Sequence, residues 1–312
     1  IRHSAGCHIV VGDNGSTDDS IEYIKNNFPE VAIIRLPTNE GFSKGYNLVL
    51  RQVQSEYYVL LNSDVEVTAG WVAPVISLMD KDPLIAACQP KILSFYQKDT
   101  FEYAGAAGGF IDKLGYPFCR GRVFTTLEKD KGQYDDIKQI FWATGACMFI
   151  KSSIFHKFNG FDDYFFAHME EIDLCWRMNS AGYKVMYQGG SKVFHIGGGT
   201  LPKTNSRKTF LNFRNSLMML HKNLSTAQKI KIFPIRLFFD FIACLRFLVI
   251  GQIESSKAIL NAYLYYFKYS GKMYSRTKVQ DRGDFKEMPI YNGSIIVSYF
   301  FKNKKVYSEL RI

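Results

Sequence analysis

Apolar strand patterns alternate with helical patterns over the first 61 residues of this 312-residue chain. Residues 7–11, 31–36 and 57–61 are rich in strand-forming side chains, whereas residues 21–27 and 43–54 carry apolar residues at helical spacing. Strands separated by a helix are joined by right-handed crossovers and lie parallel. The alternation therefore predicts an α/β fold with a doubly wound, mostly parallel sheet.

The third predicted strand ends on a short acidic tip, Asn62-Ser63-Asp64-Val65-Glu66. The carboxyl ends of parallel strands form the ligand crevice of an open α/β sheet, and carboxylate oxygens there suit Mg²⁺ or Mn²⁺ holding a diphosphate. A second acidic cluster, Glu170-Glu171-Ile172-Asp173, begins a predicted helix over residues 169–181. Together the two clusters predict metal-assisted transfer from a nucleotide-activated substrate.

Each of these signals also has a purely structural interpretation. Asn, Ser and Asp are common turn residues, and an acidic first turn stabilises many helices. Glu170, Asp173 and Arg177 share one helix face, where they can pair with each other. His195 follows an apolar strand, where a lone His is more often a structural residue than a ligand. The glycine-rich stretch 102–122 fits either a mobile lid or a small hairpin.

Cysteine usage indicates the redox environment of the protein, and the charge distribution indicates its binding partners. The six cysteines are scattered without a CxxC pair, so neither a zinc ribbon nor a disulfide framework is expected, and a reducing, cytosolic setting fits best. The net charge of +10 is uneven, because residues 1–202 carry 19 Lys and Arg against 23 Asp and Glu, whereas residues 203–312 carry 20 against 6. That basic third is also rich in Phe, Leu, Ile and Tyr, which favours an anionic membrane surface as partner over nucleic acid, for which no motif is recognisable.

The C-terminal third predicts helices over residues 208–222, 230–251 and 255–269. The second of them is strongly apolar, but no uncharged run in it reaches the ~20 residues that a membrane-spanning helix needs. The interruptions are Pro234, Arg236, Asp240 and Arg246. An amphipathic helix lying in the plane of the membrane is therefore expected. The alternative is a helical pair that packs on the preceding domain or forms a homodimer contact.

Seven short motifs, taken in their order and spacing, resemble glycosyltransferase family 2 with a GT-A fold. They are Gly12-Asp13-Asn14-Gly15-Ser16-Thr17-Asp18, Asn39-Glu40-Gly41-Phe42-Ser43-Lys44-Gly45-Tyr46-Asn47, Leu61-Asn62-Ser63-Asp64, Thr144-Gly145-Ala146, Gly160-Phe161-Asp162, Glu170-Glu171-Ile172-Asp173-Leu174 and His195-Ile196-Gly197-Gly198-Gly199. Within that family the chain resembles the rhamnosyltransferase-like bacterial branch that builds surface polysaccharides. The resemblance covers about residues 7–224.

The resemblance also implies an organisation. Residues 1–224 would form the GT-A domain, residues 225–275 amphipathic membrane-proximal helices and residues 276–312 a basic C-terminal tail. Members of the family begin with a strand and a helix that precede the start of this chain, so the sheet is expected to lack its first strand and helix. An alternative function follows from that expectation, namely a non-catalytic nucleotide-sugar-binding remnant or scaffold.

Particular residues acquire roles from the resemblance. Asp64 occupies the metal-binding position of the family's Asp-x-Asp motif, whose first Asp is here Asn62, and His195 falls on a further metal or diphosphate contact. Glu171 falls on the catalytic base, where Asp is usual, with Glu170 and Asp173 as neighbouring candidates. The expected nucleotide-sugar contacts are Asp13, Asn14, Ser16, Asn39, Gly41, Lys44, Asn47, Asn62 and Ser63.

The resemblance implies an inverting transferase. It would move a sugar from a nucleoside diphosphate to a hydroxyl of a lipid-linked or polysaccharide acceptor, with Mg²⁺ or Mn²⁺ neutralising the departing diphosphate. A carboxylate within hydrogen-bond reach would accept the proton of the acceptor hydroxyl. The expected location is the cytoplasm, peripherally on the inner membrane face.

Overall fold

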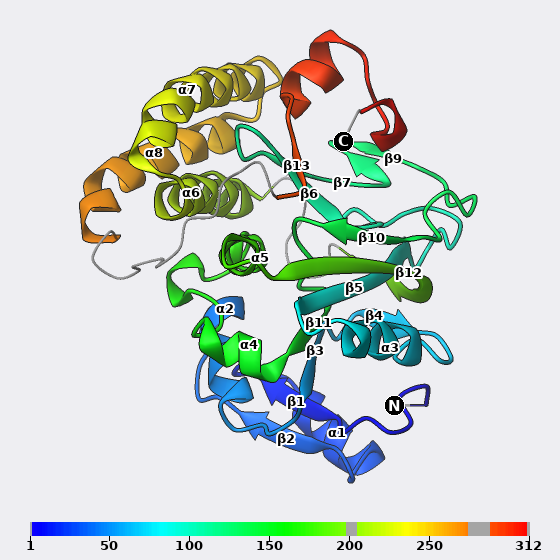
Figure 1. The fold of residues 1–312 in the computed structure, drawn as a ribbon. Helices are drawn as coiled ribbons and strands as arrows, with labels where there is room; N and C mark the ends of the chain where they lie inside the picture. The colour runs from blue at the N-terminus through cyan, green and yellow to red at the C-terminus, as the bar shows by residue number, and fades with distance from the viewer. Residues whose placement is uncertain (1, 198–204, 274–287, 311–312) are drawn as a thin grey trace.

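The computed structural model describes residues 2–197, 205–273 and 288–310 (Figure 1). Gly198 and Gly199 of the last motif and residues 276–287 of the expected tail lie outside these described residues. The chain begins as expected with alternating strands and helices. They are β1 (Val10–Asp13), α1 (Ser20–Asn27), β2 (Ala32–Arg35), α2 (Gly41–Leu50) and β3 (Tyr57–Leu61).

The strands of this first part belong to two sheets. β1 and β2 pair in parallel as a two-stranded sheet, with Val10 opposite Ala32. β3 instead lies at one end of a larger sheet with the order β10-β12-β5-β11-β3, and β4 pairs with β12 beside this path. The further strands of this sheet are β4 (Val65–Val67), β5 (Ile85–Ser94), β10 (Ile137–Ile140), β11 (Cys147–Lys151) and β12 (Lys184–His195).

The large sheet is mixed. β12 and β5 run parallel, as the crossover argument requires, while β11 is antiparallel to both β3 and β5 and β10 is antiparallel to β12. The α/β class is confirmed, but antiparallel pairs outnumber parallel ones in this sheet. The antiparallel pairs arise because β11 lies between β3 and β5 and runs antiparallel to both. It separates two strands that a simple doubly wound order would place side by side.

One predicted strand begins later than expected, after a loop. The sequence predicts a strand over residues 141–150, whereas β10 ends at Ile140 and β11 begins at Cys147. In this loop Phe141 and Trp142 bond the backbone of Gly109, whereas Thr144 donates its N–H to Gln89 Oε1 at 3.0 Å. A Cβ on Gly145 would lie 2.8 Å from the ring of Phe42, so glycine lets α2 approach this loop closely.

The glycine-rich stretch forms a small sheet. β6 (Gly109–Asp112), β7 (Pro117–Cys119), β8 (Arg122–Val123) and β9 (Thr126–Leu127) follow one another as antiparallel neighbours, and β13 (Ile290–Tyr291) joins β6 in parallel. Most of these residues are buried, which supports the hairpin interpretation over a mobile lid. Residues 288–310 pack on this sheet through Tyr299, Tyr307 and Leu310, so this part of the expected tail belongs to the folded core.

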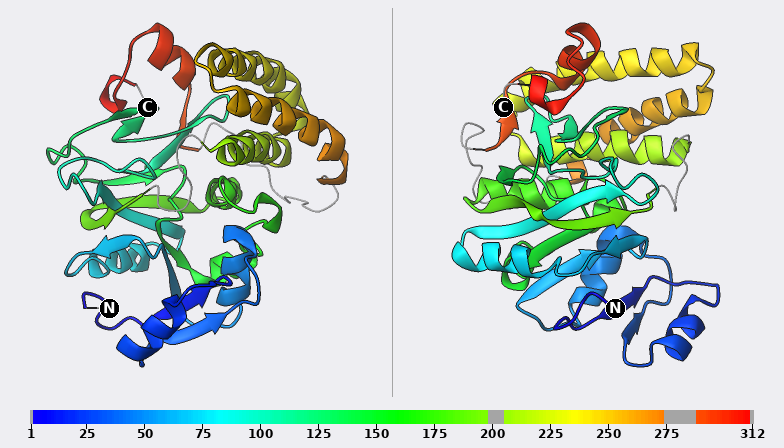
Figure 2. Two further views of the ribbon diagram at one scale, coloured as in Figure 1. Left: turned by 180° about the vertical axis from the view of Figure 1, so that it is seen from behind. Right: turned by 90° about the vertical axis from the view of Figure 1, so that its right-hand side faces the viewer.

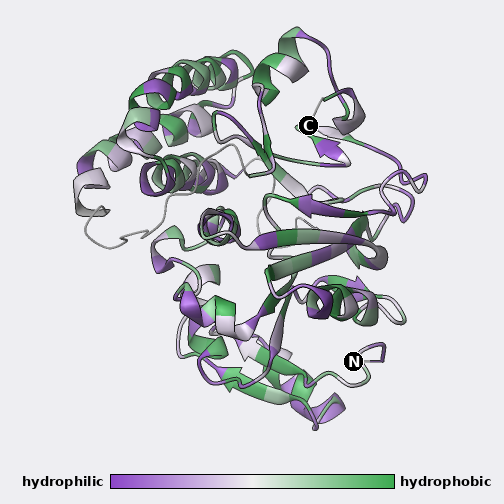
Figure 3. Ribbon diagram, in the orientation of Figure 1, coloured by the Kyte–Doolittle hydropathy of each residue, from purple (hydrophilic) through white to green (hydrophobic). Residues whose placement is uncertain are grey.

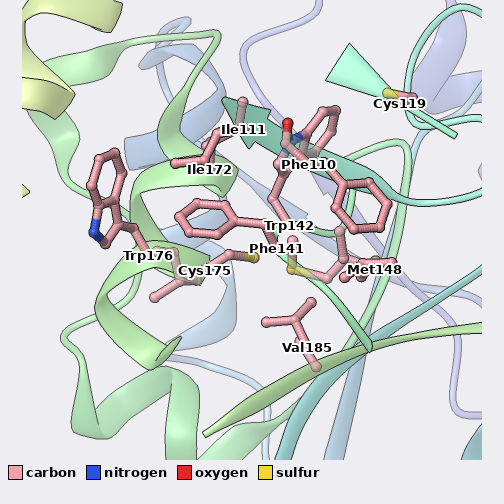
Figure 4. Packing of buried hydrophobic residues seen from close by; sticks show 14 of the residues in the cluster. Phe110, Ile111, Cys119, Phe141, Trp142, Met148, Ile172, Cys175, Trp176 and Val185 are labelled. Atoms are coloured by element: carbon pink, nitrogen blue, oxygen red, sulfur yellow. Dashed lines mark hydrogen bonds between the residues drawn. The ribbon is translucent and has the colours of Figure 1, made fainter. Parts of the chain in front are cut away.

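Helices cover the large sheet and build the main core. α3 (Ala73–Lys81) and α4 (Ser152–Lys157) contact its strands, and α5 (Glu170–Ser180) lies between the sheet and the C-terminal helices (Figure 1). Figure 4 shows the packing beside α5, where the ring of Trp176 lies 5.4 Å from that of Phe141, in one cluster with Ile172, Trp142 and Met148. Trp176 is 1% exposed and Trp142 is 4% exposed. α5 is therefore firmly held on its apolar side.

Three C-terminal helices complete the molecule, and all three are predicted by the sequence. They are α6 (Ser206–Asn223), α7 (Thr226–Val249) and α8 (Ile253–Met273), stacked beside one another in both views of Figure 2. Arg236 and Asp240 do not face solvent, because Arg236 stacks 3.6 Å above the ring of Tyr116 and Asp240 accepts hydrogen bonds from Tyr116 and Tyr263. None of the helices in the described part of the chain is long and apolar enough to cross a membrane.

Candidate active site

The acidic tip and His195 meet because two strands are paired beyond the end of β3. β4 runs antiparallel to β12, with Val65 opposite His195, and Ile196 donates its N–H to the carbonyl of Asp64 at 3.0 Å. His195 Nε2 then lies 3.1 Å from Asp64 Oδ1. Two residues that are 131 positions apart in the chain thus share one site.

Glu102 is a third member of this site that sequence reasoning missed. Its Oε2 lies 3.3 Å from His195 Nδ1, and it also accepts the N–H of Ala104. Burial alone would lower the pKa of His195, but the carboxylates of Glu102 and Asp64 outweigh it and raise that pKa. Glu102 stands alone in a glycine-rich segment, so no spacing pattern could have identified it.

The Asp64 and His195 side chains fit a divalent cation that is shared with a diphosphate. Among the described residues, no group of three His, Cys, Asp or Glu side chains is arranged to hold a metal by itself. Mg²⁺ sites commonly use only one or two carboxylates and take their remaining oxygens from substrate phosphates and water. Asp64 is suited to this, since its side chain is 30% exposed while that of His195 is 7% exposed.

Asp13 and Asn14 organise the loops around β1. Asp13 Oδ1 accepts the N–H of Ser16 at 2.9 Å, and Oδ2 lies 3.1 Å from Arg35 Nε without hydrogen-bond alignment. Burial would raise the pKa of Asp13, but Ser16 and Arg35 outweigh it and lower that pKa. Asn14 accepts the N–H of Glu40 at 2.9 Å and donates to the carbonyl of Gly41 at 3.0 Å. The loop after β1 and the loop before α2 are thereby tied together.

The other expected nucleotide-sugar contacts lie on α2 and after β3, where several are engaged within the protein. Asn39 Oδ1 accepts the N–H of Gly41, and Lys44 pairs with Glu40 at 2.6 Å. Asn47 is buried, and its side chain donates to the carbonyl of Phe161 and accepts the N–H of Phe161. Asn47 therefore has a structural role.

α2 lies beside the acidic tip. Tyr46 donates its hydroxyl to the carbonyl of Leu61 at 3.4 Å, directly before Asn62. Asn62 donates its N–H to the carbonyl of Ala146, and the carbonyl of Asn62 accepts the N–H of Val65. These two hydrogen bonds fix the turn that carries Asp64. Ser63 in the same turn is exposed. The residues from β1, α2 and β3 thus form one connected region around the tip.

The acidic cluster on α5 divides into two environments. Asp173 is fully buried and is bound by Arg177 at 2.9 Å, Lys222 at 2.8 Å and Asn223 at 2.8 Å. Burial would raise the pKa of Asp173, but these partners outweigh it and lower that pKa. Glu170 and Glu171 each have a buried Oε2 without a hydrogen-bond partner among the described residues.

The two unpaired glutamates are easier to protonate than usual. Burial raises the pKa of Glu171 to about 7. Burial and the neighbouring Glu171 raise the pKa of Glu170 well above its ordinary value. A carboxylate with such a pKa, free of a cation, is suited to accept a proton near neutral pH. Asp173 has instead the environment of a structural ion pair.

Comparisons with known proteins give a consistent result. The model of a family described as Glycosyl transferase family 2 matches residues 4–158. N-acetylglucosaminyl-diphospho-decaprenol L-rhamnosyltransferase of Mycobacterium tuberculosis (strain H37Rv) is 24% identical over 202 residues, which are 60% of this chain and 66% of that protein. Rhamnosyltransferase WbbL of Escherichia coli (strain K12) is 37% identical over 78 residues, which are 25% of this chain and 29% of that protein.

A solved structure shares the fold. GalNAc-T7, whose crystal structure contains UDP, GalNAc and Mn²⁺, superimposes with a TM-score of 0.55 at 16% identity. The superposition covers 72% of this chain and 43% of that protein. At that identity the likeness establishes the fold alone.

Proposed function

Because this chain belongs to glycosyltransferase family 2 and has a GT-A fold with a helical C-terminal part, we propose that it is an inverting, metal-dependent sugar transferase. Its family and its rhamnosyltransferase relatives support sugar transfer in glycan synthesis. The donor we propose is a nucleoside-diphosphate sugar, and the acceptor is a hydroxyl of a lipid-linked or polysaccharide glycan of the cell surface.

The state of Glu171 is the observation that carries this proposal. Its Oε2 is buried at the start of α5 with no cation bound to it among the described residues, and its pKa is raised to about 7. A general base works best when its pKa lies near the working pH, and such a base contributes typically ~10²–10⁴-fold to the rate. Glu171 would take the proton of the acceptor hydroxyl as that oxygen attacks the anomeric carbon.

The acidic tip would stabilise the leaving group, which is the diphosphate. Asp64 and His195 would hold the divalent cation, Mg²⁺ or Mn²⁺, whose charge neutralises the departing diphosphate. Glu102, 3.3 Å from His195 Nδ1, would orient that ring, as carboxylates do for many metal-binding histidines. A base on the acceptor side and a leaving group on the other side imply a single displacement with inversion.

The nucleotide would bind at the loops around β1. Asp13 keeps one carboxylate oxygen without an aligned hydrogen bond, which suits acceptance from a base or ribose group. Asn14, Asn39 and Gly41 shape the neighbouring loop through the hydrogen bonds that join them. Mutual bonding of this kind preorganises a loop, which reduces the ordering cost of binding.

We further propose that the enzyme works on an anionic membrane surface. Large apolar side chains on α7 and α8 are exposed, as Phe238 and Phe267 are at 60% and 66%, and both helices carry extensive apolar stretches in Figure 3. The basic C-terminal third would attract anionic lipids, and a relative whose name specifies a decaprenol-linked substrate is consistent with work at a membrane. A second copy of the chain is the alternative partner for this face.

Release of nucleoside diphosphate tests the proposed function. Purified protein with Mn²⁺ and a membrane lipid extract should release diphosphate from at least one of a panel of UDP-, dTDP- and GDP-sugars, and Glu171→Gln should lower that release by ~10²–10⁴-fold. Saturable donor binding by calorimetry without release from any donor would favour the second candidate, a nucleotide-sugar-binding protein without turnover.

A further inference from the structure

The segment that leads into α5 has an unusual backbone. Phe166, His168 and Met169 all have positive φ values of 64°, 71° and 74°, although none is glycine. Residues with a Cβ rarely adopt this left-handed conformation, and it persists only where the surroundings hold it. The next residues are Glu170 and Glu171, so the conformation of this segment sets where the two carboxylates point.

One amide from α6 holds the segment. Asn215 Nδ2 lies 2.9 Å from the carbonyl oxygen of Phe165, 2.8 Å from that of Ala167 and 2.7 Å from that of His168. Asn215 is fully buried. Three carbonyl oxygens can gather around one nitrogen only because it donates two hydrogens to them. Asn215 therefore fixes the turn in which the left-handed residues lie.

Arg214 binds the same segment. Its Nη2 donates to the carbonyls of Tyr164 at 3.3 Å and Phe165 at 3.0 Å, and its Nε donates to Asn215 Oδ1 at 2.8 Å. The last bond orients the Asn215 amide with its nitrogen toward the segment. The guanidinium is in turn surrounded by the rings of Tyr164, Phe210 and Tyr265 at 5.4–5.9 Å.

The segment also touches the donor side of the site. The carbonyl of Phe166 accepts the N–H groups of Phe42 at 2.7 Å and Ser43 at 3.2 Å, at the start of α2. A short left-handed segment thus connects α2, which borders the acidic tip, with α5, which carries the proposed base. Within the described part of the chain, Asn215 of α6 is the only side chain that binds three carbonyls of this segment.

We propose that Arg214 and Asn215 are positioning residues that aim the Glu171 carboxylate at the acceptor. The proposal rests on the proposed function of Glu171 and assigns to α6, which lies beyond the matched residues 4–158, a part in the chemistry. Neither residue is among those predicted from the motifs. A misplacement of about 1 Å at a reacting group costs ~10²-fold in rate, so loss of the amide donor should lower kcat by about that factor.

The test compares two isosteric changes. Asn215→Asp keeps the shape and the acceptor for Arg214 but removes the donor to three carbonyls. Asn179→Asp is the matched control, because Asn179 of α5 is also a buried amide and donates to two carbonyls, of Phe141 and Cys175, both at 2.8 Å. Hydrogen exchange is followed at residues 164–170, and kcat, donor KM and the pH profile of kcat are measured on the full chain.

We expect Asn215→Asp to speed exchange at residues 164–170 by about tenfold or more, to lower kcat by about 10²-fold and to shift the pH profile, with donor KM little changed. Asn179→Asp should destabilise the protein without these three effects. Unchanged exchange in Asn215→Asp, or equal kcat losses in both variants with the same pH profile, would overturn the proposal.

A second variant covers the case in which Asn215→Asp does not fold. Arg214→Lys keeps the charge but loses the planar fork that binds Tyr164, Phe165 and Asn215, so it should reproduce the exchange and kcat effects more weakly. Normal exchange and kcat in Arg214→Lys would contradict the assignment. If the wild type released no nucleoside diphosphate at all, the proposed function would fail. Altered exchange would still establish that Arg214 and Asn215 fix the conformation of residues 164–170.

Discussion

The first turn of α5 places three carboxylates in contrasting surroundings. Asp173 faces two cations and an amide, while Glu170 and Glu171 have buried oxygens and no cation. The helix N-terminus favours negative charge at all three positions, but that effect is worth only about 0.3–1 kcal/mol. Burial raises the pKa of all three, but Lys222, Arg177 and Asn223 outweigh it at Asp173. These partners separate a structural carboxylate from two that readily take up a proton.

Exchange of these carboxylates for amides should have opposite consequences. Glu171→Gln removes a proton acceptor without breaking an ion pair, so kcat should fall by ~10²–10⁴-fold with an unchanged or raised melting temperature. Asp173→Asn leaves Arg177 and Lys222 without their buried partner and should cost about 3–5 kcal/mol of stability. Calorimetry and steady-state kinetics on both variants check this, and the reverse ranking would move the base to Asp173.

Removal of Asp64 should abolish metal-dependent donor binding. Asp64→Ala removes the ionised ligand beside His195, and the amide of the neighbouring Asn62 is a poor replacement for it. Titration calorimetry with nucleoside diphosphate, with and without Mn²⁺, measures this. Glu66→Ala is a suitable control, because Glu66 is two residues away and pairs with Lys98 at the surface. Equal Mn²⁺-dependent affinity in both variants would refute the metal assignment.

The raised pKa of Glu171 makes both rate and stability depend on pH. Its ordinary value is 4.5 and its folded value is about 7, so the folded protein binds the extra proton between these limits. The resulting stability is complete below about 4.5 and is lost as the pH rises through about 7, while kcat rises over the same upper range. Rate and thermal-unfolding profiles should show both trends in the wild type. In Glu171→Gln the rate trend should disappear and the stability trend should weaken, because burial still raises the pKa of Glu170.

At the scale of elements, the sequence predicted most helices and the strands around the tip. Residues 57–61 and 169–181 were located well because apolar spacing is strong there and the pattern is local. The separation of β3 from β1 and the return of β11 were not predictable, because strand order depends on pairing between distant segments. Glu102, Arg214 and Asn215 were missed for the same reason, since each acts through a partner far away in the chain.

The exposed face of α7 leads to a prediction at this scale. Phe238, Phe241 and Leu245 are spaced i, i+3, i+7 and are 60%, 52% and 44% exposed, and burial of one such side chain is worth about 1.5–3 kcal/mol. Replacement of all three by Ser should release the protein from anionic vesicles in a sedimentation assay, and high salt should weaken wild-type binding.

The control for this experiment replaces Tyr23 and Tyr96, which are 60% and 74% exposed far from the C-terminal helices in sequence, by Ser. That variant should sediment with vesicles like the wild type. If the α7 variant instead remains bound but changes from a dimer to a monomer in size-exclusion chromatography, the face serves a second copy of the chain.

The whole molecule is more interdependent than a three-part division at residues 224 and 275 suggests. Leu217 of α6 is fully buried in one cluster with Cys244 of α7 and Ile259 of α8. β13 pairs with β6, and the ring of Tyr307 lies 5.2 Å from that of Phe110 in the main core. The C-terminal third therefore covers apolar surface of the preceding part, as well as contributing the basic charge.

Deletion of residues 225–312 should consequently unfold more than the helices it removes. It would uncover Leu217 and the main-core positions under residues 288–310, at about 1.5–3 kcal/mol for each large side chain, against a typical total stability of about 5–15 kcal/mol. We expect an aggregating protein without a cooperative thermal transition. A monodisperse deletion variant that melts cooperatively and binds nucleoside diphosphate would contradict this.

The placement of the tryptophans makes the protein's own fluorescence selective. The three of them, Trp71, Trp142 and Trp176, are buried at 3%, 4% and 1% exposure, and all belong to the half that carries the candidate site. Emission would therefore report on the core beneath α5 and α3, while loss of α7 or α8 by itself would leave the spectrum nearly unchanged. Circular dichroism sees those helices, so the two optical signals together distinguish detachment of the C-terminal helices from collapse of the catalytic half.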